Sequence, residues 1–117
     1  MTEINIFRHS NDAVDLAVGE TLFREGDPGD VMYAVVEGEI ALTLHDELLE
    51  VIGHGSIVGE MALVDSVPRS TTAVVRTAAR VVPVDRRQFT FLVHEHPTFA
   101  LQVMTVMAER LRRANEH

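Results

Sequence analysis

The sequence predicts a mainly β fold: an antiparallel β-roll of the jelly-roll type with about eight strands, a short helix inserted in it and two C-terminal helices. Short apolar stretches separated by turn residues recur from about residue 4 to residue 84. Glycine and proline interrupt these stretches at short intervals, as expected for strands joined by tight turns. From about residue 85 to residue 115 the apolar residues change to helical spacing.

The composition is that of one globular domain. The chain has 117 residues, enough for one hydrophobic core and too few for a second domain of normal size, so we expect a single domain over residues 1–117. Apolar residues make up 46% and charged residues 24%, which suggests neither disorder nor a membrane span. The longest apolar runs, such as residues 32–36, are far shorter than the roughly 20 residues of a spanning helix.

Charge and cysteine content narrow the range of partners. The formal net charge of −8 disfavours tight nucleic-acid binding, because that affinity depends on lysine and arginine neutralising phosphates. The sequence has no cysteine, and its first residues lack the basic start and apolar core of a secretory signal. We therefore expect a cytoplasmic protein without disulfides that contacts neither nucleic acid nor membrane.

The first strands of the predicted roll are short. Alternating apolar residues at Val14, Leu16 and Val18 predict one strand, and the isoleucines in residues 4–6 leave open another ahead of it. Residues 21–24 are expected to be extended. These segments would form one side of the roll.

The middle of the roll is predicted as a hairpin. Residues 26–30 form a dense turn signal, and residues 31–36 read as a buried strand because they are almost wholly apolar. The Glu-Gly pair at residues 37–38 predicts a hairpin turn into a further strand over residues 39–44.

The remaining strands close the roll. Residues 45–47 predict a second hairpin tip, after which residues 48–52 return as a strand. Residues 70–75 and 80–84 are predicted as the closing pair. The roll thus extends over about residues 4–84.

Two helices are predicted after the roll. Asp85 and Gln88 have the spacing of a capping box, which opens a helix that ends near His96. Pro97 is compatible with a first helical turn, and residues 98–115 contain no helix breaker, so a long last helix follows.

The last helix carries apolar residues on two faces. One face, which we expect to cover the roll, consists of Phe99, Val103 and Val106. The other has the spacing of a coiled-coil seam and consists of Ala100, Met104, Met107, Leu111 and Ala114. A seam of this kind needs a partner helix, although a single broad core stripe is the alternative interpretation.

Residues 53–73 combine the features of an anion site. Three glycines allow a loop in which the backbone adopts unusual angles or approaches a ligand closely; they are Gly53, Gly55 and Gly59. Helix-forming residues 60–63 follow, so the first amides of that turn are unpaired donors at the positive end of a helix.

Two charged side chains in this stretch suggest the ligand. Arg69 follows Pro68, which restricts the backbone, and a guanidinium can donate to two phosphate oxygens at once. Glu60 can only accept hydrogen bonds, so it suits a sugar hydroxyl and repels a second phosphate. With Ser70 adding a hydroxyl, these residues fit a 3′,5′-cyclic nucleotide monophosphate.

At this point the chain resembles a known family. G-E-M-A-L at residues 59–63 and P-R-S-T-T at residues 68–72 resemble the phosphate-binding cassette of the cyclic nucleotide-binding domain family, the sensor module of catabolite-activator-type regulators, cyclic-nucleotide-dependent kinases and gated channels. Residues 19–40 resemble the early strands of the family, so the resemblance covers about residues 14–111.

The resemblance implies roles for individual residues. Gly59 and Glu60 would hold the ribose, while Arg69 and Ser70 would hold the phosphate. The expected ligand-binding set is Gly59, Glu60, Met61, Ala62, Arg69, Ser70, Thr71 and Asn115. Asn115 lies where relatives contact the purine and could read a base edge through its amide, although a frayed polar terminus is the alternative.

The sequence departs from the family pattern at two positions. Val58 replaces a phenylalanine that many members carry, and Thr71 replaces a common alanine, which leaves ligand preference open. Ser70 stands where the resemblance links alanine or serine with cyclic AMP and threonine with cyclic GMP, so cyclic AMP is favoured over cyclic GMP.

The expected function is therefore that of a non-catalytic sensor. The nucleotide would order the cassette and shift the last two helices, which relay the signal to an unknown downstream protein. The resemblance favours a homodimer through the last helix. Transcriptional relatives carry a helix-turn-helix domain after the sensor, whereas this sequence ends at His117, so we expect no DNA binding.

Two alternatives remain. A ligand-free dimerisation or docking scaffold of the same fold would need neither Glu60 nor Arg69. A cupin-type metal enzyme needs clustered histidines, but His45 is expected at a hairpin tip, His54 in the glycine loop and His94 at a helix end. We therefore expect no metal and no catalysis.

Overall fold

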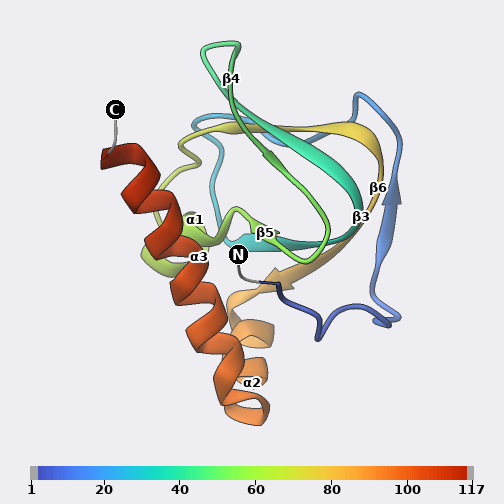
Figure 1. The fold of residues 1–117 in the computed structure, drawn as a ribbon, viewed down its shortest axis with the longest axis vertical. Helices are drawn as coiled ribbons and strands as arrows, with labels where there is room; N and C mark the ends of the chain where they lie inside the picture. The colour runs from blue at the N-terminus through green and yellow to red at the C-terminus, as the bar shows by residue number, and fades with distance from the viewer. Residues whose placement is uncertain (1–2, 116–117) are drawn as a thin grey trace.

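The computed structural model describes residues 3–115 and shows an antiparallel β-roll followed by two helices, which confirms the predicted fold class (Figure 1). The strands are β1 Val14–Leu16, β2 Thr21–Phe23, β3 Val31–Leu44, β4 Glu47–Ile52, β5 Ile57–Val58 and β6 Thr72–Asp85. The helices are α1 Glu60–Asp65, α2 Arg86–Glu95 and α3 Pro97–Asn115. Of these three, none is long and apolar enough to cross a bilayer.

Two long strands, β3 and β6, form the centre of the roll and run antiparallel beside each other (Figure 1). Their register extends from Val31 opposite Asp85 to Thr43 opposite Thr72. Within the described residues, β1 and β2 pair with the outer edge of β6, and β4 and β5 pair with β3. The sheet curls around these two strands into a roll.

The hairpin predicted at residues 37–38 is wrong, because β3 continues through this position. Gly38 has a φ of 82°, and three register shifts between Val35 and Ile40 show that the strand bends here. A Cβ on Gly38 would lie 2.3 Å from the backbone oxygen of Ala78. The glycine therefore makes a bulged bend against β6, where a hairpin would have reversed the chain.

Other strands also differ from prediction. β6 is one strand where two were predicted over residues 70–75 and 80–84, and β3 likewise replaces two predicted strands. With the changes at residues 4–6 and at β5, residues 3–115 contain six strands where about eight were predicted. Residues 4–6 form no strand, although Ile4 is buried and its N–H donates to the Gly55 carbonyl at 2.6 Å. The two-residue strand β5 was not predicted and pairs with β3.

The core has two parts. One lies inside the roll and includes Ile40, Val58 and Val75. The other lies between the roll and the C-terminal helices, where the Phe99 ring is 5.6 Å from the Phe7 ring, centroid to centroid. The second part attaches α2 and α3 to the roll.

The capping box predicted before α2 is confirmed. The Gln88 N–H donates to Asp85 Oδ1 at 2.8 Å, and the Asp85 N–H donates to Gln88 Oε1 at 3.0 Å. α2 ends with the His96 N–H donating to the Leu92 carbonyl, and Pro97 begins α3. The first turn of α2 is thereby fixed directly at the end of β6.

α3 shows the two faces that its sequence predicts. The buried face consists of Phe99, Val103 and Val106. On the seam face, Met104 and Leu111 are 55% and 64% exposed, whereas Met107 packs partly against the core. A large part of the seam therefore remains open to solvent.

Gly38→Ala should destabilise the protein, since alanine is strained at φ 82° and its Cβ would meet the Ala78 carbonyl. We expect the free energy of unfolding in urea to fall by about 2 kcal/mol. Gly53→Ala is the control, because Gly53 has open space around its Cβ position and no left-handed φ. Equal effects of the two substitutions would contradict this account of the bend.

Candidate functional site

A cavity of about 160 Å³ lies between α1, the segment before β6 and the end of α3. Seven of the eight predicted ligand-binding residues line it, namely Gly59, Glu60, Met61, Ala62, Arg69, Ser70 and Thr71. Phe23, Leu42 and Val58 add apolar wall from the roll. The fold thus brings together residues from two segments that the predicted cassette contains.

Asn115, the eighth predicted residue, does not line this cavity. It is exposed in the last described turn of α3. The residue of α3 that does line the cavity is Arg110. A base-reading role for Asn115 stays a prediction.

Gly59 makes the turn that starts α1. Its backbone is left-handed, with φ 82° and ψ 12°, and a Cβ there would lie 2.5 Å from Arg69 Nη1. Glycine therefore allows both the turn and the close approach of the guanidinium. The left-handed turn is the unusual backbone geometry that the glycine loop predicts, and the ribose-holding role of Gly59 stays a prediction.

Arg69 is 6% exposed and is held by backbone groups. Its Nη1 donates to the Gly59 carbonyl at 3.0 Å and its Nη2 to the Val31 carbonyl at 2.5 Å, while the guanidinium carbon lies 4.2 Å from the centroid of the Phe23 ring. The buried Nε has no hydrogen-bond partner among the described residues. Two of the five N–H donors are thus used by backbone carbonyls, which fix the orientation of the guanidinium.

Burial lowers the pKa of the Arg69 guanidinium below its ordinary value, because a charged group loses hydration inside the protein. Electrostatic interactions with the acidic groups of Tyr33, Asp30, Asp27 and Glu60 act in the opposite direction and raise this pKa. An arginine starts from so high a pKa that it stays protonated at neutral pH. The cavity therefore carries a permanent positive charge.

Glu60, the first residue of α1, is 2% exposed and pairs with Arg110 of α3. Arg110 Nη2 also donates to the Ile57 carbonyl at 2.6 Å, and its Nε lies 3.3 Å from Glu50 Oε2. Glu50 also forms an ion pair with Arg113, whose Nη2 lies 2.5 Å from Glu50 Oε1. The C-terminal half of α3 is thus held to β4, β5 and α1 by charged contacts.

Arg110 is a charged residue of the cavity wall that the sequence did not predict. It follows Val106 by four positions and so continues the stripe of Phe99, Val103 and Val106 that faces the core. A charged residue on a buried stripe must find a partner. The four-residue spacing from Val106 could therefore have marked Arg110 as a buried charge. Which carboxylate Arg110 pairs with depends on how α3 crosses the roll.

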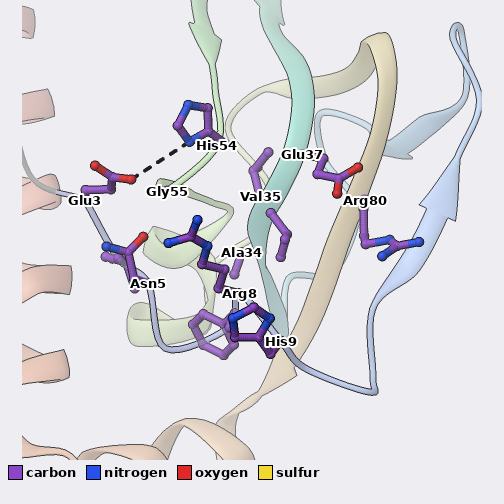
Figure 2. A pocket seen from close by; sticks show the side chains of 13 residues that line it. Glu3, Asn5, Arg8, His9, Ala34, Val35, Glu37, His54, Gly55 and Arg80 are labelled. Carbon is purple, nitrogen blue, oxygen red and sulfur yellow. Dashed lines mark ion pairs between the residues drawn. The ribbon is translucent and has the colours of Figure 1, made fainter.

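A second, larger hollow of about 480 Å³ lies between the N-terminal segment and the outer surface of the roll. Figure 2 shows Glu3, Arg8, His9 and His54 around it, with His54 Nδ1 4.0 Å from Glu3 Oε1. The His54 and Glu3 side chains are 75% and 57% exposed. These are solvated side chains at the surface, and they do not line the cavity of about 160 Å³ beside α1, here called the cavity below α1.

The histidines do not form a metal centre within residues 3–115. The side chains of His45 and His94 are each 84% exposed. No group of three or more histidine, aspartate or glutamate side chains in the described part of the chain could hold a metal ion. The clustered ligands that a cupin-type enzyme requires are therefore not found there.

The sequence comparisons place this chain among the cyclic nucleotide-binding proteins. The family model described as "Cyclic nucleotide-binding domain" matches residues 13–96. The chain is 32% identical over 109 residues to a CRP-like cAMP-activated global transcriptional regulator of Mycobacterium tuberculosis, covering 89% of this chain and 49% of that protein. The chain thus spans about half the length of that curated relative.

Solved structures show the same fold. The catabolite activator protein of Thermus thermophilus superposes with a TM-score of 0.78 at 29% identity, over 88% of this chain and 51% of that one. The EAL enzyme Bd1971, in forms described as cAMP-bound and cGMP-bound, is 31% identical over 89% of this chain and 29% of its own, with TM-scores of 0.64 and 0.65. The antiparallel roll with C-terminal helices is common to all of them.

Arg110→Ala should destabilise the fold, because Glu60 would remain as a buried charge without its partner. We expect the free energy of unfolding to fall by about 3 kcal/mol. Arg112→Ala is the matched control, since Arg112 lies exposed on the same helix and should change stability by less than about 0.5 kcal/mol. Glu60→Gln added to Arg110→Ala should restore part of the loss, and no restoration would contradict the pairing.

Proposed function

The chain belongs to the cyclic nucleotide-binding domain family, and on that premise we propose that it binds a 3′,5′-cyclic nucleotide monophosphate in the cavity below α1. The observation that supports this most directly is the burial of Arg69 and Glu60 in the wall of one cavity. A cation and a carboxylate side by side suit a ligand with one negative charge and a neighbouring hydroxyl. In this proposal the protein binds the nucleotide and does not chemically change it.

Arg69 and Ser70 would hold the phosphate. The guanidinium is already oriented by the Gly59 and Val31 carbonyls, so little conformational entropy is lost when an anion binds. Its remaining donors, including the unpaired Nε, can meet phosphate oxygens after a small adjustment. Ser70 is exposed beside it and can donate from its hydroxyl.

Glu60 would accept a hydrogen bond from the ribose hydroxyl, next to the Gly59 turn. Its pair with Arg110 keeps the carboxylate in place, because both side chains lie in the same cavity wall. Met61, Ala62 and Thr71 complete the wall around the sugar-phosphate ring. Arg110 thereby connects the ribose subsite to α3.

The size of the cavity supports a link between binding and the C-terminal helices. A volume of about 160 Å³ is below the 300 Å³ at which ligand pockets usually begin, so it admits the sugar-phosphate part more readily than a whole nucleotide. Because Arg110 lines the same cavity, room for a base is gained by moving α3. Nucleotide binding would then favour a second position of α3, and α3 would relay that change to a downstream protein.

Cyclic AMP is the preferred ligand in this proposal. The preference rests on Ser70, because the family resemblance links serine at this position with cyclic AMP. Thr71 beside it replaces an alanine that is common in the family and so changes the shape of the cavity wall. The EAL enzyme with the same fold has both a cAMP-bound and a cGMP-bound form, so the likeness to it favours neither nucleotide.

We further propose that the chain forms one sensing module that pairs with a second copy through α3. Leu101, Met104 and Leu111 are each more than half exposed on that helix, and burial of such apolar side chains stabilises helix pairs. A net charge of −8 argues against nucleic acid as a partner of this module. We propose that the module is located in the cytoplasm.

Arg69→Gln should weaken cyclic AMP binding by about 10-fold to 100-fold, because a charge-assisted hydrogen bond to phosphate contributes about 1.5–3 kcal/mol. Isothermal titration calorimetry measures the dissociation constants, and thermal melts check that the variant folds. Arg24→Gln is the matched control, since Arg24 is exposed and does not line the cavity. Equal affinity of parent and Arg69→Gln would refute the phosphate assignment.

A thermal-shift panel separates a nucleotide sensor from a ligand-free scaffold. Cyclic AMP should raise the melting temperature more than cyclic GMP, because a ligand that binds the native state stabilises it. Linear 5′-AMP should have little effect, since its phosphate carries a second charge near neutral pH that Glu60 repels. If none of the three nucleotides shifts the melting temperature, the scaffold interpretation is correct instead.

A further inference from the structure

Arg86, the first residue of α2, contacts the end of α1 and plays no part in the cavity itself. Its Nη2 donates to the Leu63 carbonyl and to Ser66 Oγ, in both cases at 2.5 Å. Leu63 lies in the last turn of α1, and Ser66 is its C-cap residue. One guanidinium therefore joins two helices that are separated in sequence by the whole of β6.

α1 needs such a contact because it is short. It has six residues, and the last carbonyls of a helix have no partner within it. Ser66 ends the helix in a left-handed conformation, with φ 58° and ψ 31°, and its N–H donates to the Ala62 carbonyl. The last turn of α1 carries no basic residue, so Arg86 supplies the positive charge that favours a helix C-terminus.

The base of Arg86 is itself fixed to the roll. Asp85, directly before it, is the N-cap of α2 and is locked by the capping box with Gln88. Asp85 also stands opposite Val31 in the β3–β6 register, and the Val31 carbonyl holds Arg69. The backbone that carries Arg86 thus pairs with the backbone that positions the phosphate-binding guanidinium.

We propose that Arg86 is a positioning residue that fixes the C-terminal end of α1 against the first turn of α2, so that a displacement of α1 is passed to α2 and α3. This inference rests on the proposed nucleotide site. Glu60, Met61 and Ala62 line the cavity at the other end of the same helix. A helix of six residues is about 9 Å long and moves as one piece, so a change at Glu60 reaches Leu63 and Arg86 directly.

The chain offers a matched control for this contact. Arg87 follows Arg86 and is exposed, and its side chain forms none of the hydrogen bonds or ion pairs found among residues 3–115. Arg86→Gln and Arg87→Gln remove the same charge at neighbouring positions of the same helical turn. A difference between the two variants therefore reports the bonds to α1 and not the net charge at the start of α2.

Hydrogen–deuterium exchange on the full chain, with and without cyclic AMP, tests the proposal. Without nucleotide, Arg86→Gln should increase exchange about 10-fold over residues 60–66, because the α1 carbonyls lose a charged partner. With cyclic AMP, the nucleotide-induced change in exchange over residues 86–115 should fall to less than half of that in the parent. Arg87→Gln should match the parent in both measurements.

A double substitution tests the bonds themselves. Ser66→Ala should raise exchange in α1 in the parent and have little further effect in Arg86→Gln, since the two side chains act through one contact. Additive effects of the two substitutions would overturn the proposal, as would parent-like exchange in Arg86→Gln. Loss of the signal in both arginine variants would also overturn it, because net charge would then explain the effect.

Failure of the nucleotide assignment gives a different result. If the parent shows no exchange response to cyclic AMP, while Arg86→Gln still loosens residues 60–66 in the ligand-free protein, the nucleotide site is wrong and the positioning contact stands. If the parent responds to cyclic AMP and Arg86→Gln responds equally over residues 86–115, the site stands and the positioning role is wrong.

Discussion

The described structure depends on two buried charged side chains of opposite sign, Arg69 and Glu60. A guanidinium or a carboxylate removed from water costs several kcal/mol unless protein groups replace its hydration. Arg69 meets this need with two backbone carbonyls and an aromatic ring, and Glu60 meets it with Arg110. Because these partners come from β3, the turn before α1 and α3, satisfying two side chains also sets how the roll and helices fit together.

The strand β5 connects the two parts of the hydrophobic core at the site. Successive residues of a strand point to opposite faces, so Ile57 packs between roll and helices while Val58 packs inside the roll. The Ile57 carbonyl accepts a hydrogen bond from Arg110, and Val58 lines the cavity. β5 therefore connects both parts of the core to the wall of the cavity.

The helix α1 depends for its stability on contacts with other elements. Its six residues are too few for a helix that is stable by itself. At its first residue it is held by Arg110 of α3, and at its end by Arg86 of α2. Both C-terminal helices thus contact α1 through charged side chains, and Leu63 of α1 also packs in the core with Phe99 and Val103 of α3. α1 therefore lines the cavity and is at the same time in contact with both C-terminal helices.

The sequence alone determined the features that depend on near neighbours along the chain. The Gly59 turn, the capping box at Asp85 and the buried face of α3 follow from backbone preferences and spacing over a few residues, and the cassette pattern placed Glu60 and Arg69 near each other. The tertiary structure decided what depends on distant partners. A glycine such as Gly38 suits a hairpin or a bulged bend equally well, and only the path of β6 beside it selected the bend. Likewise, the spacing of Arg110 marks it as a buried charge, but its pairing with Glu60, 50 residues away, exists only because α3 crosses the roll at that point.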